Sequence, residues 1–98
     1  MESQRIEWKE VWHDEHLKGI CGFANAQGGE LHIGKNDNGE IVGIKNANEL
    51  LEKLPLKIRN SMGVVANIDL TDNGKCIVIK VNSYPNPISY HGKYYIRS

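Results

Sequence analysis

The run Cys76–Val81 constrains the fold more than any other stretch of this chain, because it is apolar at nearly every position. A strand with one solvent-exposed face alternates apolar and polar residues, so this run predicts a central strand that is covered on both faces. Asp72, Asn73 and Gly74 precede it and are strong hairpin-turn residues. Residues 64–70 alternate before that turn. The second half of the chain therefore predicts an antiparallel hairpin at the centre of a sheet.

The N-terminal segment also has the period of a strand. Residues 5–9 alternate between polar and apolar side chains, which predicts a half-buried strand. Ile6 and Trp8 would lie on one face of it and Glu7 on the opposite face.

A second hairpin is expected in the middle of the chain. Residues 30–35 alternate, residues 36–39 have turn-forming side chains, and residues 41–44 are again mostly apolar. The pattern predicts two strands joined by a turn at Asp37.

Two segments have helical spacing. Asp14 is a suitable N-cap, and apolar residues follow it at i, i+3, i+4 and i+7 as far as Gly28, so residues 14–27 predict an amphipathic helix. Asn46 begins a capping-box pattern that opens a second helix. Pro55 should kink this helix or mark its restart. The apolar stripe of the second helix consists of Leu51, Leu54, Ile58 and Met62.

The C-terminal segment completes the expected fold. Pro85 and Pro87 make a rigid connection, His91 and Gly92 form a turn, and residues 94–97 are aromatic and β-branched as in a strand. The whole pattern predicts one α+β domain over residues 1–98, with a mixed, mostly antiparallel sheet of about five to six strands and two helices. Because no polar tail follows the last strand, we expect the chain to be the N-terminal part of a longer protein.

Charge and composition limit the function. Twelve Lys and Arg balance twelve Asp and Glu, so nucleic acid would have to bind through a local basic patch. Cys21 and Cys76 lie in apolar stretches and are expected in the core, which favours a reducing, cytoplasmic setting, although two cysteines could also pair. No run approaches the roughly 18 apolar residues of a membrane span, and the N-terminus is too charged for a signal peptide.

The stretch GGELHIGKND resembles a phosphate-binding loop within one residue. Gly29, Gly34 and Lys35 fit that motif, but Asn36 stands where a Ser or Thr should hold magnesium. A phosphate loop needs glycine-rich backbone followed by a helix, whereas an alternating strand and a turn are predicted here. Nucleotide binding by the Gly29 to Lys35 stretch is therefore not expected.

Five stretches of the chain follow one family pattern, namely ESQRIEWK at 2–9, GFANAQGGELHIG at 22–34, DNGEIVGI at 37–44, PISY at 87–90 and YYIR at 94–97. Together they resemble the Schlafen AlbA-type domain. The resemblance covers essentially the whole chain and implies an α+β domain at the N-terminus of a longer bacterial protein, often followed by a winged-helix module. Such proteins are described as DNA-binding transcriptional regulators or as helicase-related.

The resemblance also implies a candidate nuclease site. Related animal domains use three carboxylates, two with the five-residue offset of Glu2 and Glu7 and one that would fall at Asn36 or Asp37. Carboxylates of this kind hold Mg²⁺ or Mn²⁺, so the catalytic candidates are Glu2, Glu7 and Asp37. The alternative is a structural role, in which Glu2 is a frayed terminal residue, Glu7 pairs with Lys9 or another surface base, and Asp37 only makes the turn. An offset of five also places Glu2 and Glu7 on opposite faces of a strand unless a bulge intervenes.

Basic and aromatic residues supply the candidates for nucleic-acid contact. The expected phosphate ligands are Arg5, Lys9, Lys35, Lys93 and Arg97, interleaved with Trp8, Tyr90, Tyr94 and Tyr95. A basic face on the second helix competes with them and comprises Lys53, Lys57 and Arg59.

Three histidines are further candidates. His32 alternates with apolar neighbours, so it should lie on the wetter face of the sheet, as a phosphate contact or as an ordinary surface residue. His13 and His16 have the spacing of zinc ligands, but no further Cys or His cluster completes a site, so solvated helix-start histidines are favoured.

Three functions follow as hypotheses. The first is a nucleic-acid-binding accessory domain of a bacterial transcriptional regulator or helicase-related protein, binding DNA in preference to RNA, with affinity completed by a downstream domain or by homodimerisation. The second is a metal-dependent ribonuclease. The third is an oligomerisation or protein-interaction module in which residues 94–97 pair across chains.

Overall fold

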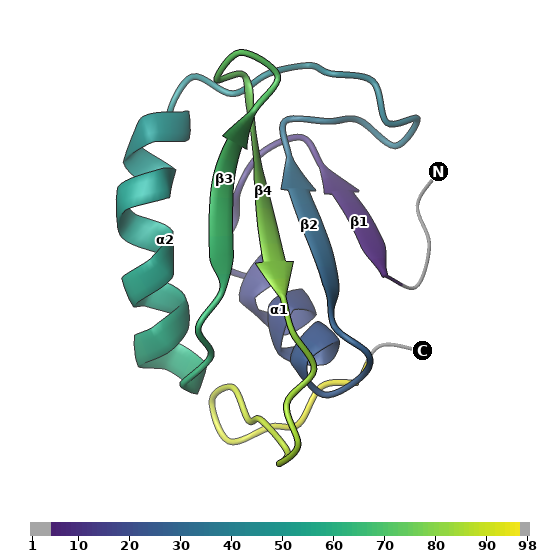
Figure 1. Cartoon of the computed structure of the whole chain (residues 1–98), viewed down its shortest axis with the longest axis vertical. Helices are drawn as coiled ribbons and strands as arrows, with labels where there is room; N and C mark the ends of the chain where they lie inside the picture. The colour runs from purple at the N-terminus through teal and green to yellow at the C-terminus, as the bar shows by residue number, and fades with distance from the viewer. Residues whose placement is uncertain (1–4, 97–98) are drawn as a thin grey trace.

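The architecture is a four-stranded mixed sheet with two helices, and the structure, a computed structural model, describes residues 5–96. The sheet order is β1-β2-β4-β3, with β1 parallel to β2 and the other neighbours antiparallel. Helix α1 connects the parallel pair, and α2 precedes the hairpin of β3 and β4 (Figure 1). The elements are β1 (Ile6–Lys9), α1 (His16–Ala24), β2 (Gly29–Ile33), α2 (Ala47–Met62), β3 (Asn67–Thr71) and β4 (Cys76–Val81).

The core lies between the helices and one face of the sheet. The register places Leu31 opposite Ile79 and Ile33 opposite Ile77, so these four side chains share the face that the helices cover. Figure 1 shows α1 behind the sheet and α2 alongside β3. Helix side chains fill this face because their apolar residues recur at helical spacing. The larger buried helix side chains are Leu17, Ile20 and Phe23 from α1 and Leu50, Leu54, Ile58 and Met62 from α2.

The opposite face of the sheet carries no helix within residues 5–96 and points toward the viewer in Figure 1. The pairing of strands aligns Trp8 with His32 and Glu30 with Lys80, and directly paired residues project from the same face. We call this surface the open face. Its side chains are Ile6 and Trp8 from β1, Glu30 and His32 from β2, Cys76, Val78 and Lys80 from β4, and Asn67, Asp69 and Thr71 from β3.

The predicted α+β class, the two helices and the central hairpin are confirmed. Asp72 and Asn73 have positive φ at the hairpin turn, and β4 is buried at every position except Lys80. The expected number of strands is too high, because four are present. Glu7 does lie on the face opposite Trp8, since it pairs with Leu31 on the helix-covered side.

The two missing strands have a common physical cause. Residues 41–44 form only a single bridge, Lys35 to Ile41, because the N–H groups of Val42 and Gly43 both donate to the carbonyl of Gly34. Residues 94–96 form no strand, because the Tyr95 carbonyl accepts from a side chain instead. In both segments the backbone hydrogen bonds that a strand would use are taken by other partners. Arg97 lies outside the described residues.

Both helices differ slightly from their predicted bounds. Helix α1 is shorter than expected, and Asp14 does not cap it but accepts hydrogen bonds from Trp12 Nε1 and Lys57 Nζ. Helix α2 runs through Pro55 without a break, because Pro55 is exposed while the apolar stripe holds the turns on either side against the core. Asn46 is the N-cap residue but makes no side-chain capping bond, so the capping box is wrong. No helix of residues 5–96 is long and apolar enough to cross a membrane.

Candidate nucleic-acid interface

A row of hydrogen-bonded polar side chains crosses the open face. Lys35 Nζ lies 3.0 Å from His32 Nδ1, and His32 Nε2 lies 2.9 Å from Glu30 Oε1. A lysine ammonium group can only donate, so this pattern assigns the imidazole proton to Nε2, which donates to Glu30. His32 is largely buried, with 13% of its side chain exposed. The row therefore fixes the orientation of the Glu30 carboxylate on the sheet surface.

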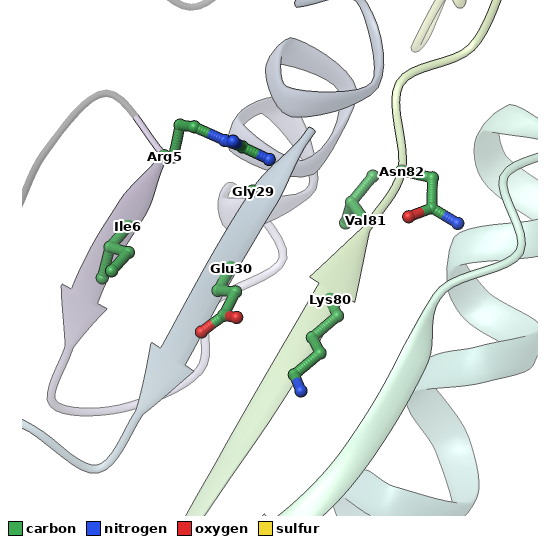
Figure 2. A pocket seen from close by; sticks show the side chains of 7 residues that line it. All are labelled: Arg5, Ile6, Gly29, Glu30, Lys80, Val81 and Asn82. Atoms are coloured by element: carbon green, nitrogen blue, oxygen red, sulfur yellow. The ribbon is translucent and has the colours of Figure 1, made fainter. Parts of the chain in front are cut away.

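A hollow adjoins this row where β1 and β2 begin and β4 ends. It has a volume of about 470 Å³ and is open to solvent. Figure 2 shows the Arg5 side chain extending toward the start of β2, Glu30 on β2 and Lys80 on β4. We call it the sheet hollow. Its lining residues are Arg5, Ile6, Gly29, Glu30, Lys80, Val81 and Asn82.

Cationic side chains outnumber carboxylates on this surface among residues 5–96. Arg5, Lys35 and Lys80 are cationic. Glu30 is the carboxylate that lines the sheet hollow, and Asp69 of β3 shares the open face because it pairs with Val78. Lys80 is exposed and forms no ion pair with any residue of 5–96. A chain with no net charge thus has a local cationic patch, which is the feature that its composition requires for contact with phosphates.

The five predicted phosphate ligands do not all meet on one surface. Arg5 lines the sheet hollow and Lys35 reaches the open face through His32. Lys9 lies on the helix-covered side, with its Nζ 3.8 Å from Glu7 Oε2. Lys93 lies in a turn of the C-terminal segment, which Figure 1 shows beyond the ends of the strands. Arg97 lies outside the described residues.

The aromatic candidates are also dispersed. Trp8 lies on the open face, but its ring packs against Gly39 of the following loop. Tyr90 is buried in the core, and Tyr95 packs against the core. Tyr94 is 66% exposed but belongs to the C-terminal segment. Stacking on bases is therefore a weaker argument for this surface than its charge.

The competing basic face of α2 is largely neutralised within the protein. Lys53 Nζ lies 2.6 Å from Glu49 Oε1, and Lys57 Nζ lies 3.0 Å from both oxygens of Asp14. These pairs are exposed and weak, but they reduce the positive potential of the helix surface. The open face is the better candidate for an anionic ligand.

The proposed carboxylate site is only partly described. Glu2 lies outside the described residues, the Glu7 carboxylate lies beside Gly19 of α1, and Asp37 is exposed in the turn after Lys35. Asn36 serves the turn, because its Oδ1 accepts from the N–H groups of Asn38 and Glu40. Among residues 5–96, no three His, Cys, Asp or Glu side chains group closely enough to hold a metal ion. Metal-dependent cleavage through Glu2, Glu7 and Asp37 stays a prediction.

His16 gives the domain a dependence on pH. Burial lowers the pKa of His16 below its ordinary value of 6.5, and the charges of Lys9 and His13 lower it further, against the opposing effect of Glu7 and Glu15. The His13 backbone N–H also donates to His16 Nδ1 at 3.2 Å, a bond that protonation of that nitrogen would remove. At mildly acidic pH, His16 therefore binds a proton more readily in the unfolded chain than in the folded domain.

We expect the free energy of unfolding to decrease as the pH falls below about 6.5, because the unfolded state then takes up more protons than the folded state. Urea unfolding of the wild type and of His16→Gln between neutral and mildly acidic pH measures this effect. The variant should show a shallower loss of stability. His91→Gln, in an exposed turn, is the control and should keep the wild-type slope. Equal slopes in the wild type and His16→Gln would contradict the assignment.

Both cysteines are free and buried, as expected for core residues. Cys76 Sγ donates to the Gly34 carbonyl at 3.4 Å, and burial raises the pKa of its thiol. A thiol held in this way stays protonated and unreactive near neutral pH. Neither cysteine contributes to the candidate interface.

Sequence reasoning missed three residues of this surface, namely Glu30, Lys80 and Asn82. A signal for one of them was present, because Lys80 is the single charged position in an otherwise apolar run. A charge there marks the place where the central strand reaches solvent. Nothing in the sequence indicated that Arg5 would lie near it, because the two are joined only through the pairing of β1, β2 and β4.

Comparison with known proteins places the chain among related domains. A family model described as Schlafen, AlbA_2 matches residues 2–98. None of the curated proteins matches the chain. Among solved structures, the DIP2311 protein from Corynebacterium diphtheriae matches with a TM-score of 0.72 and 22% sequence identity, over 89% of this chain and 19% of that chain. At this identity the likeness shows the fold alone, and the chain spans 19% of the length of that protein.

Proposed function

The chain belongs to the Schlafen AlbA_2 family, and on that premise we propose that it is a nucleic-acid-binding accessory domain of a bacterial regulator or helicase-related protein. The open face supplies the contact surface. The observation that carries the proposal is the set of three cations, Arg5, Lys35 and Lys80, on a sheet surface that no helix covers within residues 5–96. Such side chains neutralise phosphates without regard to sequence.

Three phosphate contacts give weak and salt-dependent binding. The logarithm of the association constant should fall with the logarithm of the salt concentration with a slope of about 2 to 3. Weak binding of this kind contributes to the overall affinity when a second module of the same protein binds the same nucleic-acid strand, because the contact made by this domain is then intramolecular. The proposal therefore assigns a supporting role to this domain within a larger protein.

Charge reversal of Lys80 tests the proposal. We expect Lys80→Glu to weaken binding of a fluorescently labelled oligonucleotide by about tenfold at low salt, because it removes one phosphate contact and adds repulsion. Fluorescence anisotropy measures the dissociation constant. Lys53→Glu on α2 is the matched control and should leave the constant nearly unchanged. The opposite pattern, a loss only with Lys53→Glu, would move the interface to the helix surface, and no binding by the wild type would refute the proposed function.

A further inference from the structure

Within the proposed interface, we infer that the sheet hollow binds one ribonucleotide unit, meaning a phosphate together with a ribose that keeps its 2′-hydroxyl. The inference rests on the proposed function and names the ligand of the same surface. Its basis is the pairing of two cations with one oriented carboxylate in a space of about 470 Å³. The resemblance to the Schlafen AlbA-type domain implied DNA, whereas these side chains favour a ligand that has hydroxyl donors.

Arg5 and Lys80 form the phosphate half of the hollow. Arg5 directly precedes β1 and Lys80 lies on β4, so the two residues flank β2, which carries Glu30 (Figure 2). A guanidinium and an ammonium group on either side of a strand can approach a phosphate from two directions. The Asn82 carboxamide adds a neutral donor at the end of β4. The phosphate is thus held by side chains, and the glycine backbone of β2 takes no part as it would in a phosphate loop.

Glu30 forms the ribose half. A carboxylate repels a phosphate and can only accept hydrogen bonds, so its central position favours a ligand that also carries donors. Oε1 accepts from His32 Nε2 at 2.9 Å, while Oε2 accepts no hydrogen bond from any residue of 5–96. An acidic side chain that accepts from a ribose hydroxyl is the arrangement found in dinucleotide-binding proteins. The 2′-hydroxyl is also the group by which proteins distinguish RNA from DNA.

His32 and Lys35 are positioning residues for this carboxylate. The Lys35 ammonium fixes the imidazole tautomer, and the imidazole holds one carboxylate oxygen, so the other points away from the row. Binding a ligand therefore removes little conformational entropy from the Glu30 side chain, because hydrogen bonds already hold this side chain before binding. Lys80, by contrast, is exposed and forms no ion pair with any residue of 5–96, so its side chain becomes ordered when the phosphate binds.

The size of the hollow is sufficient for one nucleotide. Small-molecule sites span about 300 to 1,000 Å³, and this hollow lies in the lower half of that range. Because it is open to solvent, the same unit can come from a free mononucleotide or from one residue of an RNA strand. The two sources share the phosphate and the ribose, and the experiment separates them.

The test is a set of NMR titrations with adenosine monophosphate, its 2′-deoxy counterpart, inorganic phosphate, and single-stranded oligonucleotides of ribose and deoxyribose type. We expect the ribonucleotides to shift the amide signals of Glu30 and Val81 and to bind about tenfold more tightly than the deoxy forms, as one charged hydrogen bond allows. Glu30→Gln should reduce that ratio and strengthen the binding of inorganic phosphate, because it removes the negative charge. A merely structural role for Glu30 would not give these opposite changes.

Two further variants complete the test. Lys80→Ala should weaken every ligand, and Lys53→Ala should change none. Equal binding of ribose and deoxyribose ligands that still depends on Lys80 would overturn the ribonucleotide inference while leaving the proposed function in place. If only oligonucleotides bind and the mononucleotides give no response, tighter binding of the ribose oligonucleotide would support the inference. Equal binding of the ribose and deoxyribose oligonucleotides would refute it. No response to any ligand would overturn both.

Discussion

Replacing Gly29 with alanine should lower the free energy of unfolding by about 3 kcal/mol. Gly29 is the first residue of β2 and packs against Phe23 of α1, and a β-carbon at this position would overlap the Phe23 ring. It would also lie 2.7 Å from the carbonyl oxygen of Arg5. Phe23 is fully buried, so its ring has little room to withdraw, and the Arg5 carbonyl is tied to the Glu30 N–H. The shift in the urea midpoint, with the slope of the transition unchanged, measures the loss.

A matched control separates this clash from the general cost of replacing glycine. Gly63 caps α2 with φ of 73° and has no atom within 4 Å of the β-carbon position. Gly63→Ala should cost only about 1 kcal/mol, through backbone strain. A double-mutant cycle adds Phe23→Leu, whose smaller side chain should recover part of the loss at Gly29. Equal losses in Gly29→Ala and Gly63→Ala would show that the helix does not press on the strand.

Gly28, which directly precedes Gly29, is required for a different reason. Gly28 has φ of 80°, and a β-carbon there would lie 2.6 Å from the Val81 carbonyl. One glycine is thus needed to turn the chain and the next to let α1 approach β2. The pair brings β2 back beside β1 after the helix, which places Glu30 next to Arg5. The same short stretch therefore determines both the packing of the helix and the geometry of the sheet hollow.

The elements that the sequence predicted correctly have a local cause. β4 and α2 have long, regular apolar patterns, and the turn at Asp72 and Asn73 has its own chemistry. The residues 41–44 also have an apolar pattern, yet they pair with the Gly34 carbonyl and with Lys75. Lys75 is distant in the sequence, and Gly34 has a positive φ of 107°, which changes the direction of the chain. No local pattern of residues could therefore indicate these hydrogen bonds.

The candidate surface was predictable to a similar extent. Alternation alone places His32 on the open face and Lys9 with Glu7 on the other side, and the structure agrees. Lys35 follows Gly34, whose backbone interrupts the alternation, so its contact with His32 depends on the three-dimensional path of the loop. The approach of Arg5 to Lys80 depends on strand order. Strand order is set by the helices that connect the strands and by the core, and not by the residues that form the surface.

The second large effect concerns Asn25, which holds the C-terminal segment against α1. Its Nδ2 donates to the carbonyls of Ile88 at 2.7 Å and Tyr95 at 2.8 Å, and its Oδ1 accepts from the Ile88 N–H at 2.6 Å. Asn25→Ala should lower the free energy of unfolding by about 3 kcal/mol, because three partly buried backbone groups lose a hydrogen bond and only the Ile88 carbonyl keeps another, from Cys21 Sγ. Hydrogen exchange should accelerate first at Ile88, since the segment can then open without the sheet.

Asn25→Asp separates the hydrogen-bond pattern from the shape of the side chain. The carboxylate keeps the acceptor for the Ile88 N–H but faces two carbonyl oxygens without a donor, so at neutral pH it should be at least as unstable as Asn25→Ala. Its stability should increase relative to Asn25→Ala as the pH falls, because the protonated carboxyl group regains one donor. If both variants lose equal stability at every pH, the shape of the Asn25 side chain matters and its hydrogen-bond donor does not. If neither variant loses stability, the segment is held by the packing of Tyr90 and Ile88 against the core and not by Asn25.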